Sequence, residues 1–117
     1  MASTNPTDHF ISLNTAKDLT RQYRDQKENI LAPEYKEQGV LPICETFSKA
    51  AIDAVMSQPG CTGLRIYMAM DTEMQVKMVL VGVDSTNQDM LGTAEPVLLE
   101  DGTRCPDICP PPSQLNS

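Results

Sequence analysis

The chain has 117 residues, 16 acidic side chains against 9 basic ones, a formal net charge of −7 and a hydrophobic fraction of 40%. This length fits one domain, and this apolar content is typical of a folded chain. Because acidic side chains predominate, the chain lacks the basic surface that nucleic acids and anionic membranes attract. We therefore expect neither as a partner. No apolar run approaches the roughly 20 residues that a membrane-spanning helix needs.

The first ten residues contain neither the basic nor the apolar segment of a secretory signal. We therefore predict a cytoplasmic location, where cysteines are thiols or metal ligands by default. The expected domain organisation is a mobile N-terminal segment at 1–10, a single domain at 11–103 and a Cys/Pro-rich C-terminal tail at 104–117.

The sequence predicts two amphipathic helices. Ser12 has the side chain of an N-cap, and the apolar residues that follow it recur at three- and four-residue spacing. Pro33 ends this helix after about five turns, because the residue before a proline avoids the α region. A second helix is expected to begin near Thr46 or Ser48 and to stop at the Gln-Pro-Gly sequence of residues 58–60.

Alternating apolar and polar residues predict a β-hairpin in the middle of the chain. Its strands are residues 63–70 and 75–84, joined by a loop at 71–74. Because two strands alone are marginal, we expect a third at 96–100, with 40–44 as the next candidate. The predicted fold class is α+β, with two amphipathic helices packed on one face of a small antiparallel sheet, followed by an extended Cys/Pro-rich tail.

The most unusual stretch is Arg104-Cys105-Pro106-Asp107-Ile108-Cys109-Pro110-Pro111-Pro112-Ser113, with two of the 4 cysteines and four of the 9 prolines. Thiolates at Cys105 and Cys109 would suit zinc or another thiophilic metal if Cys44 and Cys61 completed a four-sulfur shell. Two other interpretations stay open. The pair forms a redox or intermolecular disulfide, or the tail docks on the sheet with its cysteines as small hydrophobes.

Two further groups of residues are candidate binding sites. The first group is Pro110, Pro111 and Pro112. These prolines can serve as a polyproline ligand for a partner's aromatic groove, or they stiffen the terminus. Arg65, Tyr67 and Lys77 lie on adjoining predicted strands and can contact an anion or another ligand, or else pair with neighbouring acids. No catalytic residue is predicted, because the sequence assembles no nucleophile with a base.

Four segments together resemble a group of short, uncharacterised proteins from Bacteroidetes that end in a Cys/Pro-rich tail. They are Pro42-Ile43-Cys44-Glu45-Thr46-Phe47, Gln58-Pro59-Gly60-Cys61, Gly63-Leu64-Arg65-Ile66-Tyr67 and the Arg104–Ser113 stretch. The resemblance covers most of the chain from Ile11 and implies a bacterial, cytosolic origin. It implies no activity and no catalytic residue.

These observations predict a protein without enzymatic activity that acts through protein contacts, as a homodimer or with another partner. The alternative is a metal-binding or thiol-redox protein that uses Cys105 and Cys109 with Cys44 or Cys61. A small enzyme with a pocket lined by Arg65 and Tyr67 is the third possibility. The leading interpretation requires no cofactor.

Overall fold

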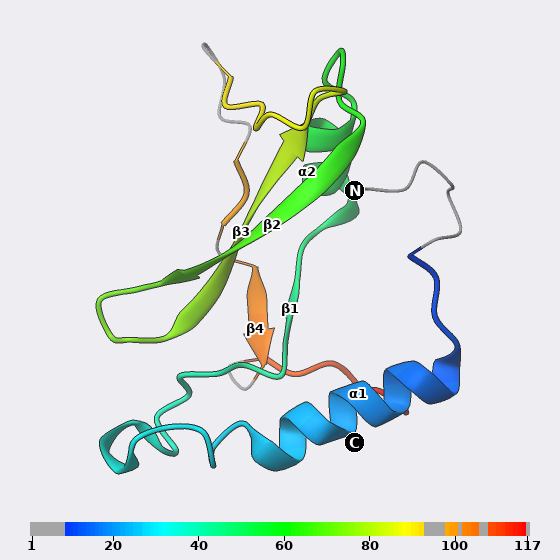
Figure 1. Cartoon of the computed structure of the whole chain (residues 1–117). Helices are drawn as coiled ribbons and strands as arrows, with labels where there is room; N and C mark the ends of the chain where they lie inside the picture. The colour runs from blue at the N-terminus through cyan, green and yellow to red at the C-terminus, as the bar shows by residue number, and fades with distance from the viewer. Residues whose placement is uncertain (1–8, 93–97, 101, 106–107, 117) are drawn as a thin grey trace.

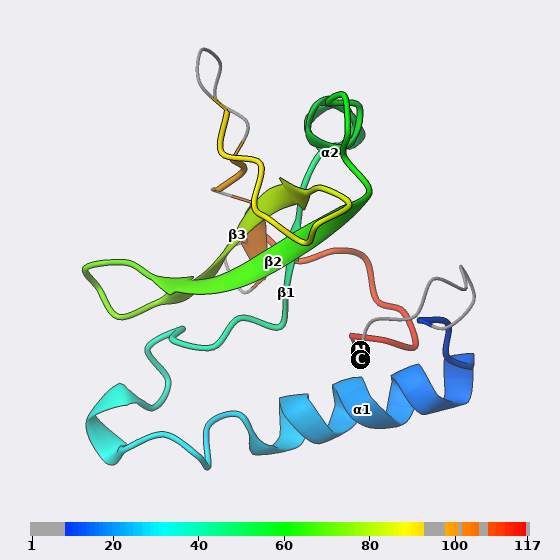
Figure 2. The ribbon, with the colours of Figure 1, turned by 45° about the horizontal axis from the view of Figure 1, so that its top comes forward.

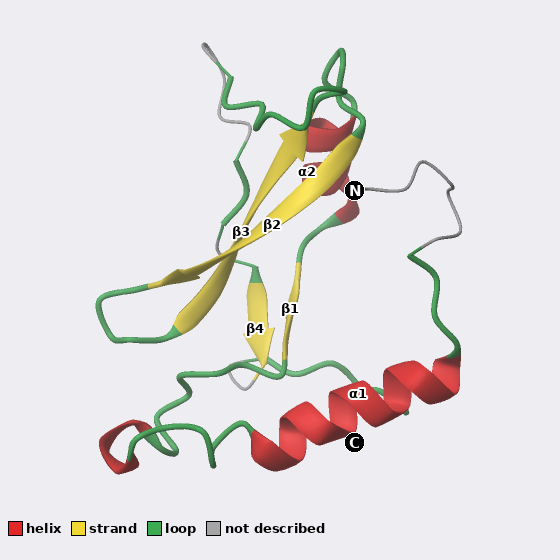
Figure 3. Cartoon of the chain, in the orientation of Figure 1, coloured by secondary structure: helices red, strands yellow, loops and turns green. Residues whose placement is uncertain are grey.

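Two short antiparallel ladders and two helices make up the chain (Figures 1 and 3). The computed structural model describes residues 9–92, 98–100, 102–105 and 108–116. In chain order the elements are α1 (Leu13–Gln26), the 3-10 turn η1 (Pro33–Tyr35), β1 (Cys44–Thr46), α2 (Lys49–Met56), β2 (Gly63–Met70), β3 (Val76–Val83) and β4 (Thr103–Cys105). The α+β class predicted from the sequence is confirmed. Neither described helix is long and apolar enough to span a membrane.

α1 begins as predicted and ends early. The Ser12 hydroxyl accepts a hydrogen bond from the Thr15 N–H at 3.1 Å, which satisfies one of the unpaired donors of the first turn. The helix stops at Gln26 rather than next to Pro33. Ile30, which would have extended its apolar stripe, is exposed. A further turn would therefore have gained no packing, and packing supplies most of the stability of helices in proteins.

α2 follows the sequence prediction closely. The Ser48 hydroxyl accepts from the Ala51 N–H at 3.2 Å, and the helix ends just before the Gln-Pro-Gly sequence of residues 58–60. Its Val55 is fully buried and lies against Gly82 of β3. This contact anchors α2 on the hairpin that follows it.

β2 and β3 form the predicted hairpin. They pair without interruption from Gly63↔Val83 to Met70↔Val76. The loop between them is closed by Asp71, whose Oδ1 accepts from the N–H groups of Glu73 and Gln75, each at 2.9 Å. Side-chain acceptance of nearby backbone donors is the reason aspartate favours tight turns.

The rest of the sheet differs from the prediction. β1 pairs with β4 rather than with the hairpin, so there are two ladders instead of one sheet. The predicted third strand contributes one bridge, in which Leu99 exchanges backbone hydrogen bonds with Leu80 at 2.9 Å; residues 96 and 97 lie outside the described part. The predicted boundary between residues 103 and 104 falls inside β4.

The core is small and lies where β3 meets α2 and the β1–β4 ladder. Its buried apolar side chains are Val40, Val55, Leu80, Val81 and Cys105. α1 contributes no buried side chain. The prediction that both helices cover one face of a sheet is therefore wrong for α1. It lies across the far end of the molecule, and residues 108–116 run between it and the strands (Figures 1 and 2).

Candidate functional site

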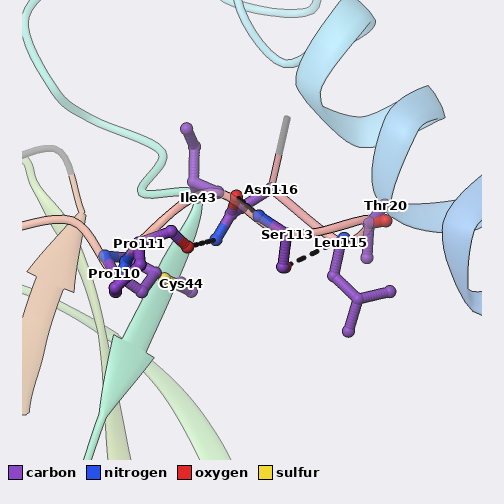
Figure 4. Close-up of a pocket in the computed structure, with 8 residues that line it drawn as sticks. All are labelled: Thr20, Ile43, Cys44, Pro110, Pro111, Ser113, Leu115 and Asn116. Atoms are coloured by element: carbon purple, nitrogen blue, oxygen red, sulfur yellow. Dashed lines mark hydrogen bonds between the residues drawn. The ribbon is translucent and has the colours of Figure 1, made fainter.

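A pocket of about 420 Å³ lies between α1, β1 and residues 108–116, which we call the tail segment (Figure 4). Most of its lining is apolar. The lining residues are Thr20, Ile43, Cys44, Pro110, Pro111, Ser113, Leu115 and Asn116. The pocket thus brings a thiol from β1 together with two of the prolines singled out by the sequence.

A small turn shapes the tail-segment wall of this pocket. The Asn116 side chain accepts from the Ser113 N–H at 2.8 Å and donates to the Pro111 carbonyl at 3.1 Å. The Arg24 guanidinium of α1 donates to the Leu115 carbonyl. Pro110 and Pro111 therefore line the chain's own pocket. Both are nevertheless exposed, as is Pro112, which does not line the pocket.

The structure joins two of the four cysteines and places a third opposite them. Cys105 and Cys109 form a disulfide, with Cα atoms 4.5 Å apart. Cys44 is free and lies directly across the β1–β4 ladder from Cys105. The disulfide-bonded Cys105 and Cys109 offer no thiolate to a metal, so the zinc interpretation requires the reduced protein. Among the described residues, no three His, Cys, Asp or Glu side chains are grouped to hold a metal ion.

Cys61 stands apart from the other cysteines. Its Sγ donates to the Gly63 carbonyl at 3.3 Å and lies against Gly82, near the end of β3. Arg104, next to Cys105, instead contacts the carbonyl of Val76 at the start of β3. Those two points on the strand are about 20 Å apart at the usual rise per residue. The structure does not bring Cys61 together with the other three sulfurs.

Sequence reasoning missed the buried ion pair between Arg104 and Glu45. Their side chains are 4% and 1% exposed, and Arg104 Nε lies 3.7 Å from Glu45 Oε1. The guanidinium also donates to the carbonyls of Val76 at 3.1 Å and Gly39 at 3.0 Å. It therefore ties β4 to β3 and to the segment before β1. The sequence carried a weak signal for this role, in that Arg104 is the single base among six acids after residue 83.

Both oxygens of the Glu45 carboxylate are buried, and neither accepts a hydrogen bond from any residue that the structure describes. Gly102 lies so close that a Cβ there would come within 2.9 Å of Oε2 and 2.7 Å of the Phe47 ring. The carboxylate thus depends on Arg104 for charge compensation, because burying an unpaired charge is costly.

The predicted anion-contact residues already have acidic partners. Arg65 donates to Asp89 at 2.6 Å, and the Tyr67 hydroxyl donates to the other Asp89 oxygen at 2.5 Å. The hydrogen bond from Tyr67 and, after it, the contact with Arg65 lower the pKa of Asp89, and the bond to Asp89 raises the pKa of Tyr67. Lys77 lies toward the other end of the hairpin, 3.9 Å from both Asp71 and Glu100. The structure therefore matches the ion-pair alternative more closely than an open anion site.

One edge of the hairpin carries backbone groups without partners. On the outer edge of β3, the Val76 N–H donates to Val40, the Gly82 carbonyl accepts from Met90, and Leu80 pairs with Leu99. The residues opposite these three on β2 are Met70, Ile66 and Leu64. In antiparallel pairs of this non-hydrogen-bonded kind, the N–H and C=O groups of the two residues point away from each other, so those of the β2 residues point away from β3. We call this outer side of β2 the free edge; its residues are Leu64, Ile66, Met68 and Met70. No described segment pairs with it.

No protein-family model, no curated protein and no solved structure matches this chain. The resemblance to the Bacteroidetes group therefore stays a prediction.

Proposed function

We propose that this chain acts by binding protein, and that its first partner is a second copy joined through the free edge of β2. The observation that supports the proposal most is the exposure of this edge. Ile66, Met68 and Met70 are 52%, 63% and 52% exposed, and their outward N–H and C=O groups have no partner among the described residues. An edge of this kind is a template for another strand.

β2 lacks the features that keep edge strands apart. It contains no proline and no lysine, and its pairing with β3 runs through eight residues without a bulge. Its single charged side chain is Arg65, which donates to Asp89; Asp89 lies next to β3, away from the free edge. Nothing along this edge repels an incoming strand.

A second copy fits this edge better than an unrelated strand. Two identical edges can pair antiparallel about a twofold axis, so that the same residues of β2 form the contact in both copies. A two-stranded hairpin is only marginally stable, and pairing β2 with its copy gives a four-stranded sheet. The exposed methionines are flexible enough to adapt to one another across the new strand pair.

The proposal is tested by the mass of the protein in solution across concentration, measured by light scattering after gel filtration. We expect a dimer at tens of micromolar that dissociates on dilution. Met68→Lys places a charge on the free edge without touching the core, and we expect it to weaken the dimer at least tenfold. Ile30→Lys makes the same charge change at an exposed site outside the sheet and should leave the dimer intact.

Two results would contradict the proposal. The first is a wild-type monomer at every concentration. The second is a dimer that Met68→Lys and Ile30→Lys weaken equally, because net charge rather than the free edge would then control association.

A cytoplasmic location is part of the same proposal, and the disulfide makes it testable. Disulfides persist in oxidising compartments and are rare in the cytosol. We expect acid-quenched alkylation of protein in cells to find Cys105 and Cys109 reduced if the chain is cytosolic. Full oxidation in cells would place the chain outside a reducing compartment.

A further inference from the structure

Three of the cysteines are arranged for chemistry with one another. Cys44 and Cys105 are directly opposed in the antiparallel β1–β4 ladder, so their side chains project from the same face. Opposed residues in such a ladder have Cα atoms about 4.5–5.5 Å apart, which is within the range that a disulfide bridges. Cys105 is therefore bonded to Cys109 along the chain and has in Cys44 a second cysteine at a backbone spacing that a disulfide can bridge.

The three cysteines differ in exposure. Cys105 is buried, Cys109 is exposed, and Cys44 is free and partly exposed. Cys44 also lines the 420 Å³ pocket, so solvent and small solutes can reach the face of β1 on which its thiol lies. A thiol has to be accessible and able to ionise before it can attack a disulfide.

We propose that Cys44, Cys105 and Cys109 form a thiol–disulfide exchange site. The Cys44 thiolate attacks Cys105 Sγ, a Cys44–Cys105 bond forms, and the Cys105–Cys109 bond breaks. The electron pair of the broken bond leaves on Cys109 Sγ, which takes up the proton that Cys44 released to solvent. One thiol and one disulfide are present before and after, so the step needs no oxidant or reductant.

The exchange changes what the tail segment is tied to. With Cys109 bonded to Cys105, Pro110 and Pro111 follow the disulfide directly and line the same pocket as Cys44. After exchange, Cys109 is an exposed thiol and the side-chain crosslink between β4 and the tail segment is gone, so the main chain alone joins them. The non-covalent contacts of the tail segment then include the hydrogen bond from the Ile108 N–H to the Arg104 carbonyl at 2.8 Å and the bond from Arg24 of α1 to the Leu115 carbonyl. The exchanged state thus offers a thiol that can attack a disulfide of another molecule, which forms a mixed disulfide and releases that molecule's second sulfur as a thiol.

Disulfide mapping of the wild-type protein tests the proposal directly. Tryptic cleavage at Lys36, Lys49 and Arg104 places Cys44 in peptide 37–49 and both tail cysteines in peptide 105–117. The protein is purified without reductant, held at pH 8, quenched with acid and N-ethylmaleimide, and digested at intervals. We expect peptide 37–49 to become linked to 105–117 through Cys105, while the maleimide label moves from Cys44 to Cys109.

Cys61 provides the matched control, because it is also free and partly exposed but lies beside Gly82. We expect the link through Cys44 to form at least tenfold faster than any link through Cys61, and Cys61→Ser to exchange as the wild type does. A maleimide label that stays on Cys44 at all times would overturn the proposal. So would links through Cys61 as frequent as those through Cys44, which indicate random scrambling.

A second variant tests the geometry alone. In Cys109→Ser, the Cys44 and Cys105 thiols remain, and mild oxidation with diamide should join them within the monomer. If both are alkylated after oxidation, or if links form only between molecules, Cys44 and Cys105 are not at bonding distance and the exchange site is wrong. Because Cys44, Cys105 and Cys109 do not touch the free edge, failure here leaves the proposed dimer unaffected.

Discussion

The hairpin with α2 and the region of α1 with the tail segment are held together in different ways. The hairpin region buries Val55 of α2 and Leu80 and Val81 of β3, and its two strands form a ladder of eight residue pairs. α1 buries no side chain and is attached by polar contacts, among them the Tyr23 hydroxyl that donates to the Pro42 carbonyl at 2.6 Å. The first region is stabilised by apolar packing, and the second by a few hydrogen bonds around a pocket.

This difference shows that an amphipathic pattern does not decide what a helix packs against. Leu13 and Leu19 lie on the apolar stripe of α1, yet both remain exposed. A helix with an uncovered apolar stripe gains little from its own domain, because burial of that stripe supplies most helical stability. α1 is therefore expected to open more readily than the hairpin.

The largest effect is expected at Arg104, which joins the two ladders to each other. Arg104→Met leaves the Glu45 carboxylate buried without its counter-charge and removes the bonds to Gly39 and Val76. Removing one partner of a buried pair typically costs about 3–5 kcal/mol of unfolding free energy. Urea denaturation followed by circular dichroism measures this loss.

Two controls sharpen that prediction. The double variant Glu45→Leu/Arg104→Met removes both charges and should recover part of the loss, since apolar replacement of a buried pair is often tolerated. Lys49→Met breaks an exposed ion pair with Asp53 and should cost only about 0.3–0.5 kcal/mol. If Arg104→Met cost no more than Lys49→Met, the pair would not be what connects the ladders.

The next effect compares one leucine from each region. Leu80 is 3% exposed and Leu19 is 61% exposed. Leu80→Ala should lower the unfolding free energy by about 2–5 kcal/mol, because it leaves a cavity in the core. Leu19→Ala should change it by less than about 0.5 kcal/mol, as is usual for surface substitutions. Equal losses in urea denaturation would mean that α1 is packed as tightly as the hairpin.

The smallest effect is a pH dependence within the hairpin region. The pKa of Asp89 is lowered by its bonds to Tyr67 and Arg65, so its contribution to stability is present near neutral pH and is lost as pH falls through the lowered pKa. The pKa of Tyr67 is raised, so its contribution is lost as pH rises through that value. Asp89→Asn should be less stable than the wild type at pH 7, with the difference shrinking in acid.

Thermal unfolding from pH 2 to pH 7 measures this convergence. A difference between wild type and Asp89→Asn that stays constant over the whole range would show that ionised Asp89 adds nothing. The α1 region provides the contrast. Asp25→Asn removes an exposed carboxylate that makes no ion pair among the described contacts, and it is the matched control for the loss of one negative charge.

The elements that sequence could predict are those with local causes. The caps at Ser12 and Ser48, the stop at residues 58–60 and the hairpin at 63–83 all depend on neighbours within a few residues, and all are confirmed. β4 was missed because its partner is β1, far away in sequence, and because nearby prolines suggested a tail. The number of cysteines in the tail did not reveal that Cys44 lies opposite Cys105, since only strand pairing brings them together.

The contact between Arg104 and Gly39 has a kinetic consequence. These residues are 65 positions apart, and closing a chain segment of that length costs about 4 kcal/mol of entropy in its logarithmic term alone. The β2–β3 hairpin closes through a loop of a few residues and can form within microseconds. Folding should therefore proceed with the hairpin formed and β1 still unpaired, and the rate should be set by the search that brings β4 to β1.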